Sequence, residues 1–100
     1  MDTVKIRKEL PSDKNSIRKV EPLMFSIRKK IDIPDEKFFC IMIAATEAVN
    51  NAIIHGNKLD KSKKTFIEIR ACKDSLCVIV EDQGGGFDPE KIEDPRTPEN

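Results

Sequence analysis

The apolar residues between Pro11 and Asp32 recur at the spacing of one helical face. The steps are three or four residues, and the positions are Ile17, Val20, Met24, Ile27 and Ile31. Ser12 or Asp13 would cap the first turn with a side-chain oxygen. Because Pro22 has no backbone donor and crowds the preceding turn, it should bend the helix. The pattern therefore predicts one amphipathic helix with a bend at Pro22.

A second helix is predicted over residues 36–55, and Gly56 and Asn57 end it. One face of this helix is apolar and consists of Phe38, Ile41, Met42, Ala45, Val49 and Ala52. Ile43 and Ile54 lie on the opposite side. A helix that is apolar on both sides should be buried on both sides or should line a cavity.

Three shorter segments have the pattern of β-strands. Residues 3–9 alternate apolar and charged side chains, which is typical of an edge strand. Residues 65–71 also alternate, whereas residues 76–81 are apolar on both faces and should form a central strand. These two strands should pair as an antiparallel hairpin. The polar, proline-containing residues 88–100 show no periodicity, so no element is predicted there.

Composition and charge narrow the classes of function. The chain has 18 basic and 18 acidic side chains, and this balance gives no bulk attraction to nucleic acid or to anionic lipid. The sequence has no apolar run long enough to span a bilayer, and its N-terminus lacks the apolar core of a signal peptide. We therefore expect a cytoplasmic protein. The cysteine spacing does not suit a zinc site or a disulfide framework. Cys40 and Cys77 should be small buried hydrophobic residues.

The helix over residues 36–55 carries the first candidate for chemistry. Glu47, Asn50 and Asn51 lie on its second side, where a buried carboxylate and buried amides would be costly unless a polar ligand satisfied them. Glu47 and Asn51 are four residues apart, so their side chains are neighbours. Together they could hold a hydrated magnesium ion, or the carboxylate could accept a proton while the amide held the metal. Incidental polar residues would give the same pattern.

The second candidate is the segment 82–87, DQGGGF, which follows the central strand. Asp82 should project from the rim of the sheet, where its carboxylate could accept a hydrogen bond from an exocyclic amine. Consecutive glycines let a backbone approach a ligand closely, although an ordinary turn has similar chemistry. The chain contains no GxxxxGK phosphate loop, which argues against a P-loop nucleotidase.

Taken together, the ExxxN helix, the hairpin and the DxGxG loop resemble the ATP-binding fold of gyrase, histidine kinases, MutL and the heat-shock chaperone, the GHKL superfamily. The helix box EAVNNAIIHGN and the glycine box DQGGGFDP are closer still to the anti-sigma serine kinase branch. The resemblance covers essentially all of residues 1–100. It implies a histidine kinase-like ATPase fold, which is an α+β two-layer sandwich with a mixed, mainly antiparallel sheet packed on helices.

The resemblance also implies roles for the matching residues, with ATP and magnesium as cofactors. Asn51 would bind the magnesium ion that bridges the triphosphate. Glu47 would be the general base that polarises the hydroxyl of a partner's serine, and Asp82 would accept a hydrogen bond from the adenine amino group.

The resemblance also gives roles to three further residues. Gly84 and Gly86 would let the loop pass under the nucleotide, and Asn50 would assist at the phosphates. The family continues with a lid, a second glycine box that wraps the phosphates, another helix and two more strands, and no such box follows Gly86. We therefore expect a fragment or a truncated version of the domain, with impaired phosphate binding and with exposed apolar faces that favour a homodimer.

The implied function is that of an ATP-dependent serine/threonine-protein kinase that acts as an anti-sigma factor. It would transfer the γ-phosphate of ATP to a serine of an anti-anti-sigma factor and would also bind the sigma factor. Direct binding of nucleic acid or membrane is not expected. Two alternatives stay open: the ATP-binding domain of a sensor histidine kinase, and a partner-binding module without catalysis.

Overall fold

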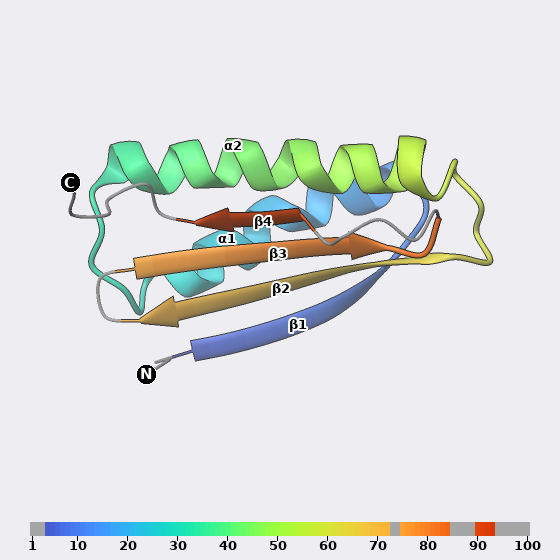
Figure 1. Ribbon diagram of the computed structural model, residues 1–100. Coiled ribbons are helices and arrows are strands. Elements are labelled where there is room, and N and C mark those ends of the chain that lie inside the picture. The colour runs from blue at the N-terminus through green and yellow to red at the C-terminus, as the bar shows by residue number, and fades with distance from the viewer. Residues whose placement is uncertain (1–3, 73–74, 85–89, 94–100) are drawn as a thin grey trace.

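The computed structural model describes residues 4–72, 75–84 and 90–93, and these form two layers (Figure 1). One layer is a four-stranded sheet in the order β1-β2-β3-β4, and each pair of neighbouring strands is antiparallel. The strands are β1 (Val4–Pro11), β2 (Lys64–Cys72), β3 (Ser75–Asp82) and β4 (Glu90–Glu93). This arrangement confirms the predicted α+β fold with a mainly antiparallel sheet, including the hairpin between β2 and β3.

The helical layer lies between β1 and β2 in the sequence and consists of four consecutive segments. They are the 3₁₀-helix η1 (Lys14–Lys19), the α-helices α1 (Val20–Arg28) and α2 (Asp35–Asn51), and the π-helical turn η2 (Ala52–Gly56). The predicted single bent helix is thus a 3₁₀-helix followed by an α-helix. Pro22 falls in the first turn of α1, where the i−4 carbonyl belongs to η1, so the missing N–H removes no hydrogen bond from within α1. Asp13 caps η1 by accepting a hydrogen bond from the Asn15 backbone nitrogen at 2.7 Å.

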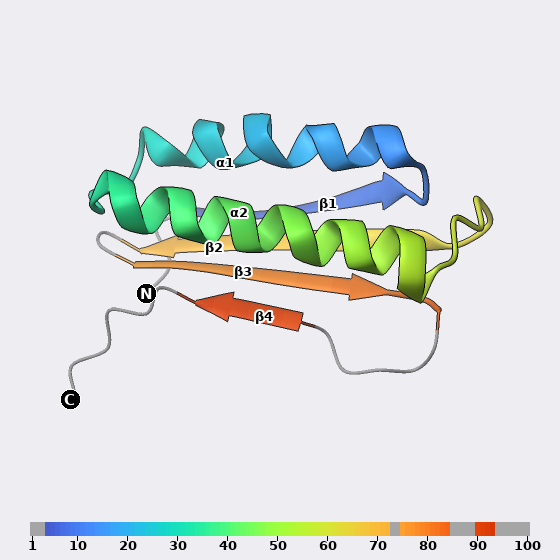
Figure 2. The same cartoon turned by 90° about the horizontal axis from the view of Figure 1, so that it is seen from above.

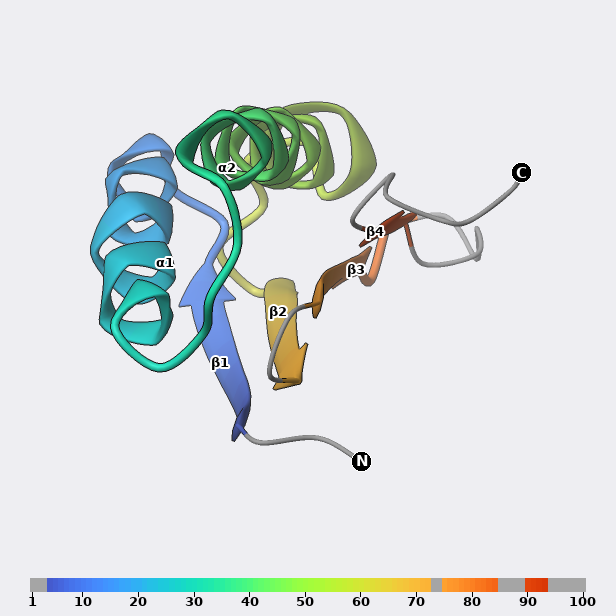
Figure 3. The ribbon, with the colours of Figure 1, turned by 90° about the vertical axis from the view of Figure 1, so that its left-hand side faces the viewer.

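Both α-helices cover the same face of the sheet, as the end-on view shows (Figure 3). Helix α2 and strand β3 run in the same direction, so their C-terminal ends lie at the same end of the molecule (Figure 2). The core between the two layers includes Leu10, Val20, Met24, Ile27, Phe38, Ile41, Ala45, Val49, Ile53, Ile67, Ile69, Val78 and Val80. The inward face predicted for residues 65–71 and the apolar face predicted for α2 are therefore both buried.

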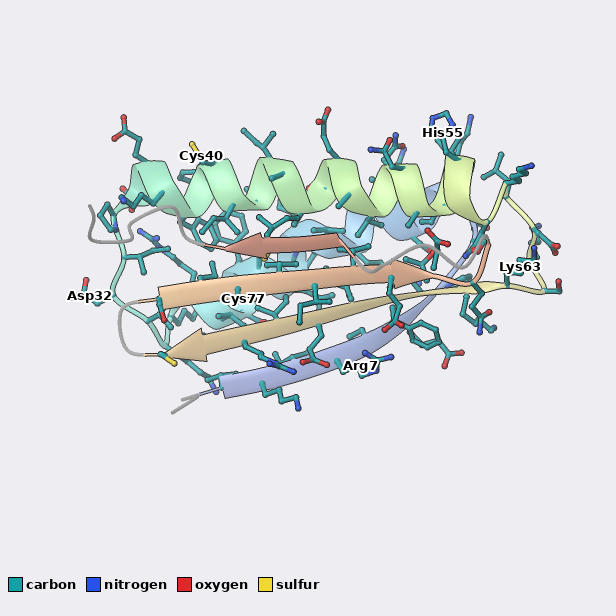
Figure 4. The ribbon with its side chains drawn as sticks, viewed as in Figure 1. Arg7, Asp32, Cys40, His55, Lys63 and Cys77 are labelled. Atoms are coloured by element: carbon teal, nitrogen blue, oxygen red, sulfur yellow. The ribbon has the colours of Figure 1, made fainter. Side chains whose placement is uncertain are left out.

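The outward side of α2 differs from the prediction that it would be buried or would line a cavity. Ile43 is 63% exposed, because the described part of the chain supplies only one layer for this helix to pack on. Cys40 is exposed on the same side, contrary to expectation (Figure 4). By length and composition alone, the continuous helical segment Asp35–Gly56 is apolar enough to cross a membrane, in contrast to the expectation from the sequence that no apolar run is long enough. Its apolar face is buried in the core, as in the core helix of a soluble protein.

Strand β4 is an element that the sequence did not predict. It pairs with β3 through only four residues, and Ile92 lies opposite Val78. Such a short strand, with one apolar residue, has no alternation that could reveal it. Ile92 packs against the core, so β4 extends the inward face of the sheet.

The outward face of the sheet carries a charged cluster around Glu68, which is buried beneath neighbouring side chains (Arg7 is labelled in Figure 4). Arg7 Nη1 lies 3.5 Å from Glu68 Oε1, and Arg70 Nε lies 2.5 Å from Oε2. The Arg7 guanidinium also stacks over the Phe66 ring at 4.8 Å. Burial by itself would raise the pKa of Glu68, but the hydrogen bond and charge of Arg70, with the charges of Lys5 and Arg7, hold it below its usual value.

Replacing Glu68 by glutamine should lower the free energy of unfolding near neutral pH by about 1 kcal/mol, because charged hydrogen bonds to two half-exposed arginines are lost. Since folding lowers the pKa of Glu68, its contribution is present above the unfolded pKa of about 4.3 and is lost as the pH falls through the folded value. Denaturant titrations of parent and Glu68→Gln, from neutral pH down to values below the unfolded pKa, measure the difference in the free energy of unfolding. This difference should shrink on acidification, and a difference that does not depend on pH would contradict the ion pair.

Candidate functional site

Asp82 is the last residue of β3 and lies on the face of the sheet that the helices cover. It stands opposite Thr65 in the strand pairing and shares its face with Val78 and Val80. Because α2 and β3 end at the same end of the molecule, the half-buried carboxylate lies against the end of the helical segment. A Cβ atom added to Gly56 would lie 2.2 Å from Asp82 Oδ2 and 2.5 Å from Cγ. The absence of a side chain at position 56 is what makes room for this carboxylate.

The loop after β3 orients the two oxygens of Asp82 differently. The Gly84 backbone N–H donates to Oδ1 at 2.9 Å. Oδ2, the atom that lies nearest to the Gly56 Cβ position, accepts no hydrogen bond from any of the residues that the structure describes. Gly84 is itself tightly packed, since a Cβ there would lie 1.6 Å from the Gly56 carbonyl oxygen. Gly86, the other predicted loop glycine, lies outside the described residues.

Asn57 joins the end of the helical segment to three other parts of the chain and is only 1% exposed. Its amide Nδ2 donates to Ser12 Oγ at 2.8 Å and to the Lys64 carbonyl at 2.9 Å. Nδ2 also lies 3.2 Å from Thr65 Oγ1. On the other side, Asn57 Oδ1 accepts the Gln83 backbone N–H at 2.9 Å. One side chain thus connects the end of β1, the start of β2 and the loop after β3.

The backbone groups around Asn57 determine which way its amide points. The Lys64 carbonyl can only accept and the Gln83 N–H can only donate, so nitrogen must face the first and oxygen the second. A further contact strengthens the junction, because Gln83 Oε1 accepts the Lys64 backbone N–H at 2.7 Å. The sequence identified Asn57 only as part of a helix end, since a single buried polar residue produces no periodic signal.

Glu47 and Asn51 lie on the outward side of α2, and both side chains are exposed. They make no hydrogen bond with any residue in the described part of the chain. Glu47 precedes Gly56 by nine residues and Asn51 precedes it by five, and the last five of these residues form the π-helical turn η2. The order along the segment is therefore Glu47, then Asn51, then the contact of Gly56 with Asp82.

Asn50 is half-buried and belongs to a different flank of α2 from Asn51. Phe25 of α1 packs edge-on against Phe39 of α2, with ring centroids 6.1 Å apart. Asn50 follows Phe39 by eleven residues, about three helical turns, and so shares the flank that faces α1. Asn51 is rotated from it by about 100° around the axis and is turned away from α1. The structure thus separates the two adjacent amides.

The π-helical turn η2 separates Asn51 from Asn57. The Asn57 N–H donates to the Ala52 carbonyl at 2.7 Å, which is a bond across five residues instead of four. Single π-turns are rare in helices and occur frequently at functional sites. His55, within this turn, is exposed and points away from the sheet (Figure 4). Lys58 and Leu59 follow with positive φ angles of 53° and 59°, so the chain turns sharply after Asn57.

Comparison with known proteins gives a family for this arrangement. Residues 10–100 match the family described as the histidine kinase-like ATPase domain. The anti-sigma F factor of Clostridium perfringens (strain 13 / Type A) is 42% identical over 69 residues, which are 69% of this chain and 48% of that protein. The serine-protein kinase RsbW of Bacillus licheniformis is 40% identical over 57 residues, which are 57% of this chain and 32% of that protein.

The chain spans about half the length of the anti-sigma F factors that it matches. The family match covers the helix box and the glycine box together, and so it confirms the resemblance inferred from those two motifs. The chain belongs to the histidine kinase-like ATPase domain family.

Proposed function

We propose that this protein binds ATP and acts as a serine/threonine-protein kinase and anti-sigma factor, transferring the γ-phosphate of ATP to a serine of an anti-anti-sigma factor. The observation that carries the proposal is the order of polar groups along the axis of the segment Asp35–Gly56: Asp82 of β3 lies against its C-terminal end at Gly56, and Asn51 and then Glu47 follow on its outward side. Asp82 Oδ2, Asn51 and Glu47 follow one another in the order in which ATP presents adenine, triphosphate and the terminal phosphate. Relatives named anti-sigma F factor and serine-protein kinase support the reaction class.

The adenine end of the proposed site is the carboxylate of Asp82. One oxygen is engaged by the Gly84 N–H, and the other is left to accept a hydrogen bond from the adenine amino group. Guanine carries a carbonyl oxygen at the corresponding position, which would repel a carboxylate. Asp82 would therefore select adenine. Gly84 holds the loop against the helix end, and we propose that Gly86 helps the loop pass beneath the nucleotide.

The phosphate end of the proposed site has one amide and few other ligands. Among the described residues no group of three or more His, Cys, Asp or Glu side chains comes together. A magnesium ion would therefore be held by the Asn51 side-chain oxygen together with phosphate oxygens and water, which is the coordination that this ion prefers. Bound ATP would supply the phosphoryl group. Asn50 lies on the α1 flank, and we propose for it only an assisting role at the phosphates.

Glu47 is placed where a partner protein can reach it. Its exposed carboxylate would accept the proton of the attacking serine hydroxyl as the serine oxygen bonds to the γ-phosphorus. The bond from that phosphorus to the bridging oxygen breaks, and ADP leaves. The substrate would be the anti-anti-sigma factor, and the second partner would be the sigma factor. Both interactions would take place in the cytoplasm, and the protein could act as a homodimer.

Removing the carboxylate of Asp82 tests the adenine assignment. In Asp82→Ala, affinity for ATP measured by calorimetry in the presence of magnesium should fall about tenfold to a hundredfold, because one hydrogen bond to the base is lost. The matched control is Glu81→Ala, which removes the neighbouring carboxylate on the opposite face of β3. Equal affinity in parent and Asp82→Ala would refute the assignment.

Replacing Glu47 by glutamine tests the general base. Phosphoserine formation on a purified anti-anti-sigma factor should fall by about a hundredfold or more, since the glutamine cannot accept the proton. Affinity for ATP should be retained, because Glu47 is not assigned to nucleotide binding. Glu36→Gln is the control, as Glu36 is exposed on the same face of α2 three turns earlier. Unchanged transfer in Glu47→Gln would remove this residue from the mechanism.

A further inference from the structure

We infer that Gly56 is a positioning residue that sets the orientation of the Asp82 carboxylate and thereby the preference of the site for adenine. This inference rests on the proposed function, because it concerns the carboxylate to which adenine recognition is assigned. Neither Gly56 nor its contact with Asp82 is part of the ExxxN or DxGxG motif. The contact joins the end of the helix box to the start of the glycine box.

The geometry leaves the carboxylate in a space that exists only because position 56 has no side chain. A Cβ there would lie 2.2 Å from Oδ2, 2.5 Å from Cγ and 2.9 Å from Oδ1 of Asp82. All three atoms belong to the carboxyl group of one side chain. A methyl group at position 56 would therefore collide first with that carboxyl group and displace it by rotating the Asp82 side chain.

The backbone around Asp82 has little freedom to follow such a displacement. The Gln83 N–H is bonded to the buried Asn57 side chain, and Gln83 Oε1 is bonded to the Lys64 N–H. Gly84 is packed against the Gly56 carbonyl, where a Cβ would lie 1.6 Å from the oxygen. The loop should keep its place in Gly56→Ala while the carboxylate turns out of its position and loses the bond from Gly84. By contrast, Gly84→Ala would collide with backbone and displace the loop itself.

The consequence is a change in specificity that loss of folding would not produce. With the carboxylate turned away, Oδ2 no longer faces the position proposed for the adenine amino group. Affinity for ATP falls, whereas affinity for GTP stays the same or rises, because the guanine carbonyl oxygen gains nothing from that carboxylate and is repelled by it. The ratio of ATP affinity to GTP affinity is therefore the property that Gly56 controls.

A double-mutant cycle on the protein tests the inference. Parent, Gly56→Ala, Asp82→Ala and the double variant are titrated with ATP and with GTP in the presence of magnesium. Gly56→Ala should lower the ATP-to-GTP affinity ratio about tenfold in the parent and should leave it unchanged in Asp82→Ala, where the displaced atoms are absent. An equal loss in both backgrounds, or an unchanged ratio in Gly56→Ala, would overturn the inference.

The chemical shift of the Gly84 amide proton provides a readout that needs no nucleotide. This proton is bonded to Asp82 Oδ1 in the parent. In Gly56→Ala its shift should move to the value found in Asp82→Ala, with the remaining amide spectrum preserved, and a parent-like shift would overturn the inference. Failure of the parent to bind ATP would refute the proposed function instead, and the Gly84 shift would still decide the role of Gly56.

Discussion

The buried amide of Asn57 is the constraint on which the proposed nucleotide end of this fold depends. The helix and the hairpin would pack together through apolar side chains in any case, but that packing is not directional. Asn57 donates hydrogen bonds to Ser12 and Lys64 and accepts one from Gln83. These bonds fix the register between the end of η2, the start of β2 and the loop after β3. Since an unpaired buried donor or acceptor is costly, all of these partners must be satisfied together.

This junction divides the proposed site into two physically different halves. Asp82 and Gly84 are held by the junction and by contact with Gly56, so the end proposed to bind adenine is preorganised before any ligand arrives. Glu47 and Asn51 are exposed on a helix surface and have no partner in the described part of the chain. Because these two side chains are exposed and unpaired among the described residues, they suit the half of the proposed site where a metal ion, phosphates and a second protein would meet.

Apolar periodicity predicted the layers of this structure because it acts through many residues at once. The buried face of α2 and the pairing of β2 with β3 follow from that signal, and the strand parity that places Asp82 beneath the helix end could have been read in the same way. Single interactions carry no period, so the burial of Asn57 and the close packing at Gly56 could not be predicted. The exposure of Ile43 escaped prediction for another reason, because sequence shows that a helix face is apolar but not what covers it.

Amide hydrogen exchange at Gln83 tests the central claim most directly. Gln83 lies at the surface in a loop, and its side chain is exposed, so its N–H would exchange rapidly unless Asn57 holds it. The account predicts protection of this amide comparable to that of the core amides of β2 and β3. Exchange at the rate of an unstructured loop would show that the junction does not hold the end of β3 against the helix, and the preorganised adenine end would be lost with it.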